Sequence, residues 1–375
     1  MRTFGMYVHV PFCGSICAYC HFARTATHDA AARAAYVDGV LREFALRREA
    51  CPRLGSAARP LATAYLGGGT PSQLEAPLME RLLAGTVGRC EHTEDFELTA
   101  EANPETLDSG LATAWRDAGI GRVSLGVQSL DAGVLRQLGR ACDPATARAA
   151  LTLACATFPR VSADWIIGPG VRQASLLAEL EEAVACGVEH VSLYILEVHA
   201  GTAMAVRVRD GAVKLPPDGV TARLYLAAAA RLAGLGLAQY EVANFARPGA
   251  ESRHNRGYWR RRPWLGLGPG AHGAWGRSRR ANHDAVTDWL ADLARGRLPE
   301  AAVDALSVAT RRLERVVLAL RTREGVPLAW LPPAALDLPR GEAEGLWCCA
   351  DGHLRLTGAG FLLIDTIEER LARRL

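Results

Sequence analysis

Three cysteines near the start of the chain have the spacing with the clearest chemical meaning. The segment Cys13-Gly14-Ser15-Ile16-Cys17-Ala18-Tyr19-Cys20 reads C-x3-C-x2-C. Three thiolates on one loop can reach three corners of a cubane cluster and leave the fourth iron with an open position. The spacing therefore predicts a [4Fe–4S] cluster with Cys13, Cys17 and Cys20 as its metal ligands.

A zinc site is the alternative, with His9 or His21 as its fourth ligand. Structural zinc sites usually pair two C-x2-C knuckles, and this chain has no second one. The other seven cysteines are scattered, and we expect them to be small buried hydrophobes rather than a disulfide framework. The spacing thus favours iron–sulfur over zinc.

Glycines and polar residues stand at or near the ends of the next apolar runs. Gly67-Gly68-Gly69-Thr70-Pro71-Ser72 can bring its backbone close to a ligand, with free amides facing it. Glu101 and Gln128 end two later runs, and Asp164 interrupts a third. A carboxylate there can accept from an ammonium group or ribose hydroxyls, although Glu101 alone is also compatible with an acid near a helix start. Polar groups inside a barrel need partners, so these residues predict a ligand site.

The elements that must position these residues alternate between strand and helix patterns. In parallel sheets with outer helices the chemistry lies at the carboxyl ends of the strands, where the unusual residues fall here. Right-handed crossovers curl such a sheet toward a full or partial barrel. The expected strands are Met6–Val10, Ala62–Leu66, Phe96–Ala100, Arg122–Val127, Val161–Ile167 and His190–Leu196, and the expected helices include Ala31–Ala50, Leu78–Val87, Leu111–Ala118, Ala145–Thr157 and Leu176–Cys186.

The alternation breaks beyond about residue 205. One more helix is expected over Thr221–Leu235, followed by an irregular segment, Tyr240–Gly273, rich in Gly, Arg and aromatic residues. A new pattern begins near residue 302, with a helix over Arg311–Arg321 and a hairpin or wing over 354–360. We therefore predict an α/β core over residues 1–205, an extension over 206–300 and a small α+β, winged-helix-like domain over 301–375.

Composition excludes several classes of protein. The net charge of +3 over 375 residues gives no electrostatic footprint for nucleic acid or for a basic membrane anchor. No run approaches the ~20 apolar residues of a transmembrane helix, and the first residues do not form a signal peptide. We expect a cytoplasmic protein with no nucleic-acid partner.

The sequence resembles the coproporphyrinogen-oxidase-like branch of the radical-SAM superfamily, and most closely the heme chaperones within it. The resemblance implies a radical-SAM partial (β/α) barrel that binds a [4Fe–4S] cluster and S-adenosyl-L-methionine (SAM). The matching stretches are Tyr7–Cys13, the cysteine motif, Gly67–Ser72, Glu101–Pro104, Gly126–Ser129, Leu138–Arg140, Tyr240–Phe245, His254–Trp259, Gly266–His272, Leu320–Gly325 and Leu356-Thr357.

The resemblance also implies roles for matched positions. Tyr7 would lie over the SAM, and the glycine turn would line its methionine end through Gly68, Gly69 and Thr70. The rest of SAM would be held by Glu101, Gln128, Arg140 and Asp164. Two departures, Gly168-Pro169-Gly170 for Gly-Leu-Pro-Gly and Cys142 near a common histidine, weaken the alignment around Asp164. No catalytic residue is assigned.

Two functions compete within this branch. An oxygen-independent coproporphyrinogen III dehydrogenase decarboxylates propionates in heme biosynthesis and typically carries C-x3-C-x2-C-x-C, whereas this chain has Phe22 at the last position. A heme chaperone carries H-N-x-x-Y-W, which is complete here from His254 to Trp259. The chaperone is therefore the favoured interpretation. Whether SAM is cleaved or only bound is left open.

The heme interpretation rests on the chemistry of that motif. His254 is a competent axial ligand for heme iron, aromatics contact a macrocycle, and arginines can pair with propionates. The alternative is an ordinary loop histidine beside solvated arginines, and His272 is a weaker ligand candidate. The partners implied are heme, acceptor hemoproteins such as membrane-associated respiratory proteins, and an electron donor such as a flavodoxin or ferredoxin. The arginines are Arg253, Arg256, Arg260, Arg261 and Arg262.

Overall fold

Six parallel strands in sequential order form the core of the computed structural model, which describes residues 3–332 and 335–374. These strands are buried on both faces over much of their length, as a parallel sheet covered by helices requires. The expected alternation of strand and helix is confirmed. The strands are β1 (Phe4–Val10), β2 (Leu61–Gly68), β3 (His92–Ala102), β4 (Arg122–Gln128), β5 (Arg160–Ile167) and β6 (His190–Ile195).

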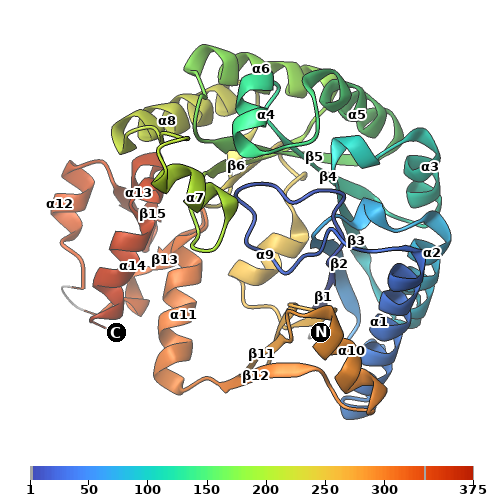
Figure 1. The fold of residues 1–375 in the computed structure, drawn as a ribbon. Coiled ribbons are helices and arrows are strands. Elements are labelled where there is room, and N and C mark those ends of the chain that lie inside the picture. The colour runs from blue at the N-terminus through green and yellow to red at the C-terminus, as the bar shows by residue number, and fades with distance from the viewer. Residues whose placement is uncertain (1–2, 333–334, 375) are drawn as a thin grey trace.

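Helices cover the outer face of this curved sheet, so the molecule is an α/β partial barrel (Figure 1). Local capping defines several helix starts: Asp29, Asp108, Asp131 and Asp143 each accept a hydrogen bond from a first-turn amide. The covering helices are α1 (Ala30–Ala50), α2 (Ala76–Gly85), α3 (Ser109–Asp117), α4 (Ala132–Leu138), α5 (Pro144–Thr157), α6 (Gln173–Cys186) and α8 (Asp218–Gly234).

The segment that the sequence left irregular adds short elements to both edges of the same sheet. β8 pairs antiparallel with β6, whereas β9 pairs parallel with β1 and leads into an antiparallel run to β12. Helix α9 lies inside the curve and contacts β2 (Figure 1). The added elements are α7 (Ala203–Arg209), β7 (Ala238–Gln239), β8 (Asn244–Ala246), α9 (Arg253–Trp259), β9 (Trp264–Leu267), β10 (His272–Trp275), β11 (Ser278–Asn282), α10 (Val286–Ala294) and β12 (Glu300–Ala305).

A small C-terminal unit has its own three-stranded sheet, β13-β15-β14, and its own apolar cluster around Trp347 and Phe361. The expected wing is only partly right. Gly358 and Gly360 do not continue the hairpin but begin a helix that Thr357 caps. The elements are α11 (Val308–Leu320), β13 (Val326–Pro327), α12 (Leu338–Ala343), β14 (Trp347–Ala350), β15 (His353–Leu356), α13 (Gly358–Leu362) and α14 (Ile364–Ala372).

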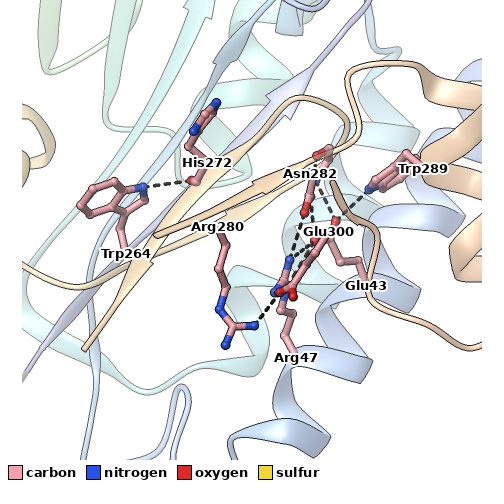
Figure 2. Close-up of polar contacts among 9 residues, drawn as sticks. Glu43, Arg47, Trp264, His272, Arg280, Asn282, Trp289 and Glu300 are labelled. Carbon is pink, nitrogen blue, oxygen red and sulfur yellow. Dashed lines mark hydrogen bonds and ion pairs between the residues drawn. The ribbon is translucent and has the colours of Figure 1, made fainter. Parts of the chain in front are cut away.

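A buried polar cluster fastens the extension to the core (Figure 2). Glu43 on α1 is fully buried and accepts from the Gly268 amide at 2.9 Å, Asn282 Nδ2 at 2.9 Å and Trp289 Nε1 at 3.0 Å. Arg47 Nη2 donates to Glu43 at 3.0 Å and Arg47 also pairs with Glu300 on β12. Because a buried carboxylate without these donors would be costly, the cluster fixes β9–β12 beside β1.

Among the described helices, none combines the length and apolar character needed to cross a membrane.

Candidate active site at the barrel mouth

An open cavity of about 420 Å³ lies at the carboxyl ends of the core strands. It gathers residues from five strands and from the loop after β1, which is the arrangement expected for chemistry in a parallel barrel. Ten of the predicted site residues share this cavity. They are Cys13, Cys17, Cys20, Gly68, Gly69, Thr70, Glu101, Gln128, Arg140 and Asp164.

The cysteine loop is held by donors that point at its sulfurs. Thr70 Oγ1 lies 3.6 Å from Cys13 Sγ, and Arg140 Nη1 lies 3.3 Å from Cys17 Sγ. Burial raises the pKa of the Cys13 and Cys20 thiols. Iron would oppose this effect, because a bound metal stabilises thiolate. Three thiolates on one loop are the donor set that an iron–sulfur cluster takes, so the residue types suit the cluster, and its ligation by Cys13, Cys17 and Cys20 stays a prediction.

A side-chain hydrogen bond and two close glycine contacts hold the cysteine loop against the end of β1. His9 Nε2, at the end of β1, lies 2.6 Å from the Ala23 carbonyl of that loop. A side chain at Gly268 would meet the His9 carbonyl at 2.5 Å, and one at Gly270 would meet the Ala23 side chain at 2.5 Å. The Gly266–His272 motif thus serves close packing, and the Glu43 cluster of Figure 2 holds it in place.

Two buried carboxylates define the polar floor of the cavity. Glu101 accepts from Tyr65 at 2.7 Å and from the Gly68 amide at 3.1 Å, and Asp164 accepts from Ser124 at 3.3 Å. Burial, with the nearby Asp164 charge, raises the pKa of Glu101 to about 7, and burial raises the pKa of Asp164 to about 6. Among the described residues, neither carboxylate forms an ion pair, although Arg122 and Arg140 act on Asp164 from a distance, so a ligand with a positive charge or hydroxyl donors would stabilise both.

Two polar atoms beside these carboxylates still need partners. Gln128 Oε1 and Arg140 Nε are buried without a hydrogen-bond partner among the described residues. Gln128 also has a φ of 66°, a strained value for a residue with a side chain, of the kind that clusters at functional sites. Carboxylates, an amide oxygen and a guanidinium together match the ammonium, ribose and carboxylate groups of SAM, so the cavity fits that ligand.

The glycine turn lines the cavity and also packs closely against its neighbours. A side chain at Gly68 would meet the His9 ring at 2.4 Å, and the Gly68 φ of 108° already disfavours one. A side chain at Gly67 would meet the Glu101 carboxylate at 2.8 Å. The turn is therefore needed to seat Glu101 and His9.

Three singled-out residues, Tyr7, His254 and His272, are not among those that line the cavity. Tyr7 stacks on Tyr65 with 6.2 Å between ring centroids, and its hydroxyl is 3.2 Å from His9 Nδ1. The predicted place of Tyr7 over SAM stays a prediction. His272 is exposed at the start of β10, and its carbonyl accepts from Trp264 Nε1 (Figure 2).

The histidine of the H-N-x-x-Y-W motif is buried and lies on helix α9 rather than in a loop. His254 is 2% exposed, with Nδ1 2.9 Å from Thr63 Oγ1 and Nε2 2.8 Å from the Tyr258 hydroxyl. Burial lowers the pKa of His254 to about 3, so the imidazole is neutral. Its ring lies 5.2 Å from that of Tyr65, which donates to Glu101. In this conformation neither nitrogen is free for iron, and heme ligation by His254 stays a prediction.

The arginines of that region lie away from the cavity and are mostly paired. Arg256 and Arg260 reach Glu324 at 2.9 Å and 3.4 Å, and Arg261 reaches Glu314 at 2.6 Å. Together with two tryptophans they border a separate pocket near the C-terminal unit. Its lining includes Arg256, Trp259, Arg260, Arg261, Arg315 and Trp330.

Sequence reasoning missed two residues that organise the site. Asn103 donates to Thr70 Oγ1 at 3.0 Å and accepts from Arg140 Nη2 at 3.0 Å, and Tyr65 supports Glu101. The spacing of two residues along a strand could have revealed both, because side chains two apart lie on the same face of a strand. Tyr65 precedes the glycine turn by two residues, and Asn103 follows Glu101 by two.

Comparisons with known proteins agree with this geometry. Residues 7–199 match the profile of the Radical SAM superfamily. A protein named heme chaperone HemW from Mycobacterium tuberculosis H37Rv is 41% identical over 99% of this chain and 95% of its own length. Radical S-adenosyl methionine domain-containing protein 1, mitochondrial, from Bos taurus is 31% identical over 99% of this chain and 87% of its length.

A solved structure matches the whole fold. Coproporphyrinogen III oxidase (HemN) from Escherichia coli, described as a radical SAM enzyme, superposes with a TM-score of 0.83. The match covers 100% of this chain and 91% of that one at 22% identity. At this identity the likeness establishes the fold alone.

Proposed function

Because the chain belongs to the radical SAM superfamily and, within it, to the family of HemW heme chaperones, we propose that it binds heme and delivers it to acceptor hemoproteins. The alternative, oxygen-independent coproporphyrinogen III dehydrogenase, shares the barrel and the cysteine loop. The choice between the two depends on residues outside the polar floor of the cavity.

The presence of Phe22 favours the chaperone over the dehydrogenase. The dehydrogenase pattern would place a fourth cysteine there, two residues after Cys20. In this chain that position holds an exposed phenyl ring, which lines the cavity. An apolar ring at the rim suits contact with a flat macrocycle better than redox chemistry.

The same cavity is proposed to hold the cluster and SAM. When bound, a [4Fe–4S] cluster of this kind supplies an electron to SAM. The protein's own contribution is placement: the three cysteines hold iron, and Arg140 fixes Cys17 while bonded to Asn103. The carboxylates of the floor accept from the ligand's donors, and burial keeps water from competing for them.

Further partners complete the proposal. An electron donor such as a flavodoxin or ferredoxin would reduce the cluster, and the acceptors would include membrane-associated hemoproteins of the respiratory chain. The protein would work in the cytoplasm.

Two assays on the purified, cluster-reconstituted protein test the proposal. Titration with heme should give a saturable Soret band near one heme per chain. Incubation with coproporphyrinogen III, SAM and a reductant should give no protoporphyrinogen IX. Efficient formation of that product, or absence of heme binding, would favour the dehydrogenase instead.

A further inference from the structure

The rim of the cavity differs from its polar floor because it exposes three large apolar side chains. Ile16 is 48% exposed, Phe22 54% and Ile195 38%, and all three line the cavity. Large apolar side chains exposed together at a ligand cavity mark a surface that an apolar partner covers. None of them has a role in holding the polar groups of SAM.

Two histidines meet at the same rim. His21 follows the cysteine loop after β1, and His199 follows β6, so they come from opposite ends of the six-strand arc. Their ring centroids lie 3.7 Å apart with 36° between the planes. His199 Nε2 lies 3.4 Å from a Glu197 oxygen, whereas His21 has no hydrogen-bond partner among the described residues. His21 therefore offers a free imidazole next to the Phe22 ring, 4.8 Å away.

The two histidines suit a metal ion that another molecule already coordinates at most of its positions. Among the described residues, no group of three or more His, Cys, Asp or Glu side chains is arranged to hold a bare metal ion. Heme iron needs only an axial ligand, since the porphyrin supplies four nitrogens, and histidine is a common choice. An exposed imidazole beside an exposed phenyl ring therefore matches heme better than a free cation.

Space and charge at the rim agree with such a ligand. The cavity of about 420 Å³ has the usual size of a small-molecule pocket and opens to solvent, so a larger ligand would project from its rim rather than enter its polar floor. Arg24 also lines it: Nη1 donates to the Phe22 carbonyl at 2.8 Å, and Nε is buried without a partner among the described residues. A propionate would satisfy such a donor.

We propose that heme binds at this rim, with His21 as its axial ligand and Phe22 against its face. This inference rests on the proposed heme chaperone function and names the site for its cargo. Heme would then sit above SAM and the cluster rather than on helix α9. His199 would act by positioning the His21 ring, and Arg24 would anchor one propionate.

Heme titrations of the full chain test this site. We expect His21→Ala to weaken heme binding by at least about tenfold and to shift the Soret band, since even outer-shell partners of metal ligands change affinity by about 10–100-fold. Phe22→Ala should weaken binding without moving the band. Imidazole added to His21→Gly should restore the wild-type spectrum, which a merely structural role for His21 would not produce.

Matched controls separate this effect from general damage. His92→Ala removes an exposed histidine that also stacks on a phenylalanine, Phe96, but at the opposite end of the sheet. It should bind heme like the wild type. Iron and sulfide content must be measured in parallel because His21 adjoins Cys20, and His199→Ala gives a second variant should the cluster be lost.

The outcomes distinguish a failure of this heme site from a failure of the proposed chaperone function. If the wild type binds heme and His21→Ala binds it equally well while His254→Ala does not, the site lies on α9 and the rim assignment is wrong. Displacement of heme by saturating SAM would place the macrocycle on the polar floor and would also overturn it. If the wild type binds no heme at all, the chaperone function itself fails.

Discussion

Removing the Tyr65 hydroxyl is the sharpest test of the polar floor. Tyr65→Phe deletes the 2.7 Å hydrogen bond to Glu101 and leaves the ring that packs against His254 in place. Glu101 has a pKa of about 7 in the ligand-free protein because burial and the nearby Asp164 charge disfavour its ionised form. The hydrogen bond from Tyr65 stabilises the ionised form of Glu101 and so partly offsets the effect of burial on its pKa.

The size of the effect follows from this pKa. A hydrogen bond to a charged group contributes ~1.5–3 kcal/mol, which corresponds to roughly one to two pH units. Loss of the donor should therefore raise the pKa of Glu101 to roughly 8–9. At pH 7 the ionised fraction falls from about one half to about 1–10%, so SAM affinity should fall about 5- to 50-fold if only the carboxylate accepts from SAM.

The assay is SAM binding by calorimetry on the cluster-reconstituted protein between pH 6 and 9. The midpoint of the affinity profile should move to higher pH in Tyr65→Phe, and much of the affinity should return at pH 9. Tyr225→Phe, which removes a buried hydroxyl bonded to the Val242 carbonyl outside the cavity, is the control. Identical midpoints for Tyr65→Phe and the wild type would refute the assigned role of Glu101.

Other predictions concern the cluster, the glycine turn and the second carboxylate. Cys17→Ala should lose the iron and the ~400 nm absorbance after reconstitution, and full retention of iron would remove Cys17 as a ligand. Gly68→Ala should lower the free energy of unfolding in urea by about 1–3 kcal/mol, because its φ is 108° and the new Cβ would meet His9. In Asp164→Asn the sign depends on pH. The folded pKa of Asp164, about 6, is above its ordinary 3.8, so the stability it contributes is complete below about pH 4 and is lost as pH rises through 6. The variant should thus be more stable than the ligand-free wild type at pH 7.5, by up to about 3 kcal/mol, and show no gain at pH 4, although it binds SAM more weakly. Equal urea midpoints at pH 7.5 would contradict the cost assigned to this buried carboxylate.

Local patterns predicted the core of the fold and the iron ligands. Three cysteines within eight residues and strands with apolar runs express short-range geometry, which sequence order records directly. The polar residues at strand ends converge because parallel strands deliver their carboxyl ends to one edge. For that reason the sequence alone could predict that Glu101, Gln128 and Asp164 share one site.

The extension was harder to predict because its elements are too short for periodicity. Helix α9 has 7 residues and β8 has 3, well below the window in which a 3.6- or 2-residue period is visible. Their places at the sheet edges depend on long-range contacts, such as the Glu43 cluster that joins α1 to β9–β12 (Figure 2).

Sequence by itself thus predicted the cluster ligands and identified the polar residues that converge on the floor of the cavity. Only the tertiary structure decided which histidines line the cavity: His254, in the more suggestive motif, is buried with both nitrogens engaged, whereas His21 and His199 meet at the rim from positions 178 residues apart. The physical reason is that burial and pairing depend on what the folded chain packs around a side chain, and residue type and spacing do not record this.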